Sequence, residues 1–225
     1  MKKKKILVVS VHPDDETLGC GGTILKHKKN GDNVAWLIIT NATVSNGYSI
    51  ESVNQINTII EEVSKAYEFN NVYNLNLPPS SLNSENHPKL ISEISDVINE
   101  YSPETIYLVN RSDAHSDHRF AFQAVLACTK SFRAPCIKQI LMYECISETE
   151  FAPSLTENVF IPNYFIDISE FIEKKCNIMN MYFTEIGVHP FPRSEKNIKA
   201  LAIFRGAIAG VEFAEAFQLL KFIDK

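Results

Sequence analysis

Strand-like and helix-like segments alternate along most of this chain, and that alternation constrains the fold more than any other feature of the sequence. The apolar run Ile6 to Val11 has the length and composition of a buried strand, and the segment from Asp15 to about Asn30 follows it as a helix. Alternation of this kind predicts parallel βαβ units, in a sheet covered by helices on both faces. We therefore expect an α/β fold with a mostly parallel sheet.

The same rhythm continues through the middle of the chain and loosens toward its end. Further strands are predicted at 33–40, 72–77, 105–109 and 137–144, and helices at 52–69, 89–101 and 120–132. Beyond residue 144 we expect short strands at 159–161 and 164–168, a helix from about 169 to 183, and helical structure over the last thirty residues. No repeat, low-complexity tract or linker interrupts the sequence, so one domain over residues 1–225 is the economical prediction.

Composition narrows the classes of function. A formal net charge of -5 argues against binding to nucleic acid or to an anionic membrane through bulk charge. No stretch is long and apolar enough to span a bilayer, so no stable membrane insertion is expected. The five cysteines are odd in number and never spaced as a metal-binding pair, which indicates reduced core residues of a cytoplasmic protein.

The first predicted strand ends abruptly at His12-Pro13-Asp14-Asp15-Glu16. The acids have a purely structural explanation. Carboxylates at the start of a helix cap its free N–H groups and interact favourably with its dipole, which together stabilises the helix by about 1 kcal/mol. One acid would suffice for that purpose. Three acids in a row behind a histidine repel one another, and a bound cation is the simplest way to make such a cluster stable.

A second polar cluster follows the predicted strand at 105–109. Within Asp113 to Arg119 lie two histidines, two aspartates and an arginine, in a chain with six histidines altogether. A polar solvated loop is the alternative interpretation. Both clusters lie at the carboxyl ends of predicted parallel strands, where ligands bind in open α/β sheets, so we expect them to meet.

Together the clusters offer two imidazoles and one carboxylate, a set that leaves a divalent metal one open position for water, as in catalytic zinc sites. The predicted ligands of Zn²⁺, with Fe²⁺ as the alternative, are His12, Asp15 and His118. Asp14 is the predicted general base, and His115, steadied by Asp117, the predicted donor to an oxyanion. This set suits hydrolysis of a carboxamide, because neither cluster holds a serine or cysteine nucleophile with a paired base.

These residues resemble a known family. His12 to Glu16, the following Thr17 to Gly22, and His115 to Arg119 are similar to the paired motifs of the LmbE-like, or PIG-L, zinc-dependent N-deacetylases. The resemblance implies a Rossmann-like fold with its site at the carboxyl ends of the strands, and the same residue roles. It also implies removal of acetyl from an N-acetylglucosamine-type moiety of a glycoconjugate or nucleotide sugar, and it favours a homo-oligomer.

The resemblance implies that loops after the second and third strands form a sugar pocket, and these loops depart from the family pattern. Many members carry Gly-Glu or an arginine after the second strand, where this chain reads Thr40 to Gly47, and commonly an aspartate near 78–82, where it has serines. The loops at 41–49, 78–87 and 186–194 therefore have no assigned role, and the substrate stays open. The candidates for contact with the substrate are Asn41, His189 and Arg193.

Two other functions remain as alternatives. The same metal could serve an esterase or phosphoesterase, although phosphoryl transfer often uses two metals. A sugar-binding module without turnover would keep the pocket and explain the unusual loops. Gly19-Cys20-Gly21-Gly22 is compatible with a dinucleotide site, but its spacing is wrong for one, and close packing of helix against sheet is the favoured explanation.

Overall fold

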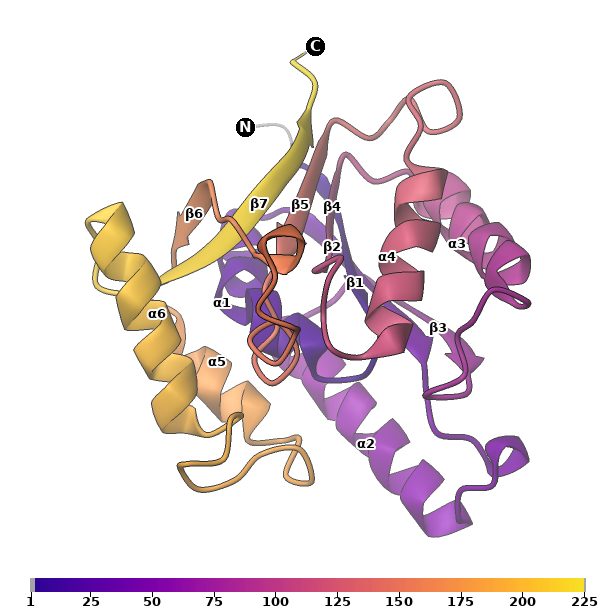
Figure 1. The fold of residues 1–225 in the computed structure, drawn as a ribbon, viewed down its shortest axis with the longest axis horizontal. Helices are drawn as coiled ribbons and strands as arrows, with labels where there is room; N and C mark the ends of the chain where they lie inside the picture. The colour runs from indigo at the N-terminus through magenta and orange to yellow at the C-terminus, as the bar shows by residue number, and fades with distance from the viewer. Residues whose placement is uncertain (1–2, 225) are drawn as a thin grey trace.

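A seven-stranded sheet runs through the molecule in the order β3-β2-β1-β4-β5-β7-β6 (Figure 1). The structure is a computed structural model that describes residues 3–224. Strands β1 to β5 pair in parallel, and β7 is antiparallel to both β5 and β6, so the predicted mostly parallel α/β sheet is confirmed. The strands are β1 (Lys5–Ser10), β2 (Asn33–Thr40), β3 (Asn71–Leu77), β4 (Thr105–Val109), β5 (Gln139–Tyr143), β6 (Tyr164–Asp167) and β7 (Ala214–Phe222).

Helices cover both faces of this sheet. The α-helices are α1 (Asp15–Lys29), α2 (Ile50–Tyr67), α3 (His87–Tyr101), α4 (Ser116–Cys128), α5 (Ile172–Met179) and α6 (Glu195–Ala209), with short 3-10 helices at Val44–Asn46 and Thr156–Asn158. The chain runs outward from β1 through β2 to β3 and then returns to β4 and β5 on the other side. Right-handed crossovers therefore place α1 and α2 on one face and α3 and α4 on the other. The observed contacts agree, since α1 packs on α2 and α5, and α3 packs on α4 (Figure 1).

The strand order reverses at β1, which pairs with both β2 and β4. Because both faces of the sheet are covered, the side chains of β1, β2 and β4 are buried along almost their whole length. Trp36 of β2 is fully buried, and its indole N–H donates to Ser10 Oγ at 2.7 Å. The reversal leaves a crevice at the carboxyl ends of β1 and β4, directly after which the two polar clusters begin.

The glycine run in α1 serves close packing, as the sequence predicted. A Cβ atom at Gly19 would lie 2.1 Å from the ring of Tyr143 in β5, and one at Gly22 would lie 2.6 Å from Ile168. The helix also kinks at Cys20, whose backbone angles are not helical. No side chain larger than hydrogen fits at these two positions, so the run brings α1 against the sheet.

The end of the chain differs from the prediction. Helix α6 ends at Ala209, Gly210 closes it in the left-handed conformation, and β7 occupies residues that we expected to be helical. The strand is stabilised by insertion between β5 and β6 and by Glu215, whose carboxylate accepts hydrogen bonds from the backbone of Gly22 and Thr23. These partners are distant in sequence, so local periodicity could not reveal them.

Smaller differences lie in the segment before α6. Residues 159–161 form no strand, and α5 stops at Met179, short of the predicted end near Phe183. Helix α4 begins four residues before its predicted start, because the side chain of His115 caps it by accepting the N–H of Asp117. Among the described residues, no helix is long and apolar enough to cross a membrane.

Candidate metal centre and active site

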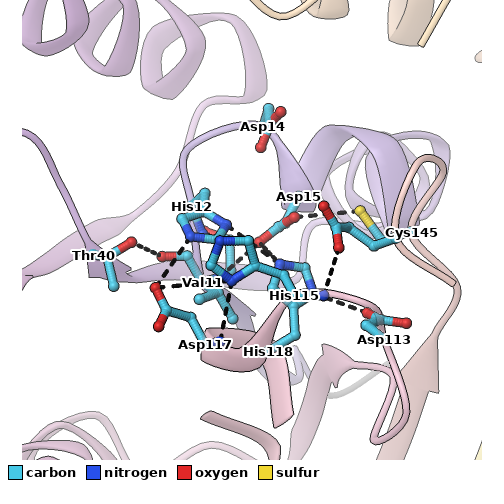
Figure 2. Close-up of polar contacts among 12 residues, drawn as sticks. Val11, His12, Asp14, Asp15, Thr40, Asp113, His115, Asp117, His118 and Cys145 are labelled. Atoms are coloured by element: carbon cyan, nitrogen blue, oxygen red, sulfur yellow. Dashed lines mark hydrogen bonds and ion pairs between the residues drawn. The ribbon is translucent and has the colours of Figure 1, made fainter. Parts of the chain in front are cut away.

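The two polar clusters meet at the carboxyl ends of β1 and β4. His12 lies between β1 and α1, Asp15 begins α1, and His118 lies on the first turn of α4. The Nε2 atom of His118 is 3.3 Å from Nδ1 of His12 and 3.4 Å from Oδ2 of Asp15. One donor atom from each of the three lies within 4.8 Å of the others. Figure 2 shows the three residues grouped with His115.

These donors fit a divalent cation. Asp113 Oδ2 accepts a hydrogen bond from the Nδ1–H of His118 at 2.8 Å, so Nε2 is the nitrogen that faces the common point and can give its lone pair to a metal. Burial by itself lowers the pKa of His118, but the carboxylates of Asp15 and Asp113 outweigh it and raise that pKa to about 9. The centre therefore attracts positive charge, and its two-nitrogen, one-oxygen set suits Zn²⁺ or Fe²⁺.

Asp113 is the acid that orients His118, a role that the sequence did not reveal. Its Oδ1 accepts hydrogen bonds from Asn110 Nδ2 at 2.8 Å and Thr149 Oγ1 at 2.7 Å, while Oδ2 faces the imidazole. The carboxylate is fully buried and both its oxygens have partners. Its position just past the end of β4 was the available signal, but sequence alone could not choose between Asp113 and Asp117.

Asp15 is held as an ionised carboxylate. Its Oδ2 accepts the backbone N–H groups of Val11 at 2.8 Å and His12 at 2.9 Å, and its Oδ1 accepts from Cys145 Sγ at 3.3 Å. Burial by itself raises the pKa of Asp15, but the imidazoles of His118 and His12 outweigh burial and hold it below its ordinary value. The carboxylate is therefore charged at neutral pH and rigidly directed.

Asp14 stands apart from this network (Figure 2). It is the capping residue of α1, with a φ of 136° in the left-handed region, yet its side chain makes no capping hydrogen bond. The residue is 5% exposed and lines the cavity described below. Burial and then the charge of Asp15 raise its pKa well above the ordinary value. A carboxylate that is free, strained and more basic than usual is suited to proton transfer.

His115 and Asp117 are also neighbours of His12. The ring centroids of His12 and His115 are 4.7 Å apart, and Asp117 Oδ2 is 3.5 Å from His12 Nε2. The backbone N–H of Asp117 donates to Nδ1 of His115 at 3.1 Å, so the proton of the neutral imidazole lies on Nε2. Burial and the neighbouring His12 lower the pKa of His115, which favours that neutral form. The predicted support by Asp117 is therefore made by its backbone, since its carboxylate is 4.0 Å from the same nitrogen.

The carboxylate of Asp117 instead positions a loop. Its oxygens accept the backbone N–H groups of Ser80 at 2.6 Å and Leu82 at 3.0 Å. His12, His115 and Asp117 also form a group with metal-ligand spacing. The set with Asp15 and His118 is the better site, because Asp113 orients His118 in the way that carboxylates commonly orient the histidine ligands of metals.

Comparison with known proteins identifies the family. The family described as PIG-L, GlcNAc-PI de-N-acetylase, matches residues 7–129, which include both clusters. The chain belongs to the PIG-L family. The match confirms the family that the two motifs predicted.

Individual relatives of this PIG-L protein are distant. The diacetylchitobiose deacetylase of Thermococcus kodakarensis is 22% identical over 224 residues, which cover 96% of this chain and 83% of the relative. The conserved protein TT1542 from Thermus thermophilus has a TM-score of 0.79 at 23% identity, covering 99% and 97% of the two chains. GalB, the 4-carboxy-2-hydroxymuconate hydratase of Pseudomonas putida KT2440, has a TM-score of 0.73 at 16% identity, covering 99% and 98%. At these identities the solved structures establish the fold.

A cavity of about 480 Å³ opens over the candidate metal centre of the PIG-L protein. Asn41 and Arg193, two of the three predicted substrate contacts, line it. The third, His189, is exposed and is not among the lining residues, because its loop points into solvent. A second cavity of about 710 Å³ lies between α6 and residues 144–160, and it shares only Cys145 with the first.

Several lining residues were not predicted. Cys145, Ser147 and Glu148 follow β5, and Glu148 Oε2 accepts the backbone N–H of His115 at 2.9 Å. Their position after the carboxyl end of a parallel strand was the only signal, since this segment carries no motif. Tyr48 lies in the loop before α2, and Gln55 lies near the start of α2. The family resemblance indicated that loop as part of the pocket, but nothing in the sequence distinguishes its lining residues from solvated ones.

Proposed function

We propose that this PIG-L protein is a metal-dependent hydrolase that removes acetyl from an N-acetylated amino sugar. The single observation that carries the proposal is the convergence of His12, Asp15 and His118 beside Asp14, a buried carboxylate that makes no capping bond of its own. Family membership supports deacetylation, and the likeness to a diacetylchitobiose deacetylase supports an acetamido sugar as substrate.

Zinc, with Fe²⁺ as the alternative, would be held by His12, Asp15 and His118. When bound, such an ion lowers the pKa of a water molecule and polarises a carbonyl group. Asp113 accepts the N–H of His118 Nδ1 at 2.8 Å and so fixes the orientation of the ring, with Nε2 facing the position where the ion would be held.

The protein's own groups then move the protons. Asp14 accepts a proton from the water as its oxygen attacks the acetyl carbon, and gives that proton to the nitrogen of the leaving amine. His115 donates from Nε2 to the carbonyl oxygen while negative charge develops on it. The C–N bond breaks, and acetate and a free amino sugar are the products.

A panel of substrates tests this reaction. Zinc-loaded protein is incubated with N,N'-diacetylchitobiose and with N-acetylglucosamine, and acetate and primary amine are both quantified. Equal amounts of the two products, and none after treatment with a chelator, are expected. The matched control is His189→Ala, an exposed histidine outside the cavity, which should leave the rate unchanged.

Two results would replace the proposal by one of its alternatives. Release of alcohol or phosphate from ester substrates, with no acetate from the acetamido sugars, would indicate an esterase or phosphoesterase. Saturable binding of the sugars to zinc-loaded protein without release of amine would indicate a binding module.

A further inference from the structure

One wall of the 480 Å³ cavity over the candidate metal centre has no charged side chain. This wall runs along the start of α2 and the loop before it, and we call it the α2 wall. Its members are Asn41, Tyr48, Ser52, Gln55 and Ile56. The Nδ2 of Asn41 already donates to Asn57 and Asn76, and its buried Oδ1 has no partner. The wall therefore offers that oxygen, one further amide, two hydroxyl groups and two apolar or aromatic surfaces to whatever fills this part of the cavity.

The charged groups of the cavity are mostly acids. The carboxylates that line it belong to Asp14, Asp15, Glu148 and Glu185. Among the described residues that line this cavity, Arg193 is the one Lys or Arg.

Arg193 is already committed to partners in the protein. Its Nε and Nη2 donate to the backbone oxygen and Oε2 of Glu185 at 2.6 and 2.9 Å, and its Nη1 donates to Ser147 Oγ at 3.1 Å. An anionic substrate group would compete with Glu185 for this guanidinium. Beyond the metal itself, the described lining of the cavity therefore has no free Lys or Arg to receive a phosphate.

We propose that the substrate is uncharged beyond its acetamido group, a neutral glycoside, and that the site disfavours phosphate-bearing glycoconjugates. This inference rests on the proposed deacetylase function and names its substrate class. Sugar hydroxyls both donate and accept hydrogen bonds. The Oδ1 of Asn41 can accept one, the amide of Gln55 can do both, and the Tyr48 ring offers an apolar surface. A phosphate would instead approach carboxylates of its own sign, which costs affinity.

A matched pair of substrates tests the inference. The methyl glycoside of N-acetylglucosamine and N-acetylglucosamine 1-phosphate carry the same sugar with a neutral or an anionic group at C1. With zinc-loaded protein at about 0.15 M salt, we expect kcat/KM to favour the methyl glycoside at least roughly tenfold. Equal or faster turnover of the phosphate would overturn the inference.

Binding separates this inference from the proposed function. The affinities of zinc-loaded protein for both ligands, and for inorganic phosphate, are measured by calorimetry. Tighter binding of the methyl glycoside supports a neutral substrate class even where neither ligand releases amine. Binding of the sugar phosphate that exceeds both other affinities would overturn the inference.

A charge placed on the α2 wall sharpens the test. Gln55→Lys adds a positive charge to the wall. It should therefore lower the ratio of kcat/KM for the methyl glycoside to kcat/KM for the 1-phosphate several-fold. The matched control is Asn54→Lys, at an exposed position on α2 that does not line the cavity, and there the ratio should hold. An unchanged ratio in Gln55→Lys would show that the substrate does not extend along this wall and would contradict the inference.

Discussion

The metal centre and the α2 wall line one cavity, but they are built in opposite ways. In the centre, His118 is fully buried, Asp15 is 2% exposed, and backbone or carboxylate partners fix each of them. On the wall, Tyr48 is 41% exposed and Ser52 and Gln55 are exposed as well. Under the proposed function, the difference assigns the reaction to the rigid strand ends and the choice of substrate to the more exposed loop and helix start.

The largest expected effect comes from Asp14, which belongs to the centre without being one of its ligands. Asp14→Asn should lower kcat by roughly 10²–10⁴-fold, because it removes the proposed proton acceptor. Metal analysis should still find one ion per chain. Asp15→Asn is the matched comparison and should lose the ion as well. If Asp14→Asn also lost its metal, the assignment of base and ligand would be wrong.

His118 makes the stability of the metal-free protein depend on pH. In the folded, metal-free protein its pKa of about 9 exceeds the ordinary 6.5, because Asp15 and Asp113 outweigh burial. This stabilisation is complete below pH 6.5 and is lost as pH rises through about 9. Urea unfolding should show a loss on the order of 3 kcal/mol across that window.

The control for the pH experiment is His118→Asn, which should remove most of the loss. Zinc-loaded protein should also show less of it, since the cation takes the place of the proton. A metal-free protein whose stability is the same at both ends of the window would contradict the electrostatics assigned to the centre.

A substitution of Asp113 tests whether zinc binding depends on the hydrogen bond that orients His118. Asp113→Ala frees His118 Nδ1 and should weaken zinc affinity roughly 10–100-fold, measured by competition with a chelator. Asp96→Ala removes an exposed acid on α3 and serves as the control. Equal affinities in both variants would mean that the ligand set does not need Asp113.

Glu16 supports Asp14 through the backbone. Its carboxylate accepts the N–H of Asp14 at 3.2 Å and the hydroxyl groups of Thr17 at 2.6 Å and Tyr182 at 2.7 Å. Glu16→Leu should lower kcat about tenfold, because Asp14 then loses a restraint on its strained conformation. Glu16→Gln can still accept the N–H and should keep most of the activity. A glutamine variant as slow as the leucine variant would indicate a role for the charge.

The smallest effect is expected on the wall. Tyr48→Ala should raise KM several-fold with little change in kcat, because it removes binding that substrate and transition state share. Steady-state kinetics with a neutral acetamido sugar measure both constants. A fall in kcat with KM unchanged would mean that Tyr48 acts in the reaction itself. The proposed difference between the metal centre and the α2 wall would then be wrong.

The grouping of His12, Asp15 and His118 could be predicted because its signals are local and chemical. His12, Asp15 and His118 end predicted strands or begin the helices after them, and their residue types match metal chemistry. Parallel strands carry such residues to one edge, however far apart they are in sequence. The alternation of strands and helices predicted that edge.

The remaining parts depend on contacts that no short stretch encodes. Strand β7 exists because β5 and β6 accept it, so Ala214 to Phe217 could be taken for a helix. The choice of Asp113 over Asp117 as the partner of His118 depends on how the first turn of α4 is rotated. His189 was expected at the cavity because of its residue type, but its loop carries it into solvent.

Zinc titration of chelator-treated protein tests the central claim most directly. Acetate release from a neutral acetamido sugar is followed as zinc is added in steps. We predict no activity without metal, and a linear rise that reaches its plateau at one zinc ion per chain. Full activity in the metal-free protein, or a plateau only at two ions, would contradict a single centre formed by His12, Asp15 and His118.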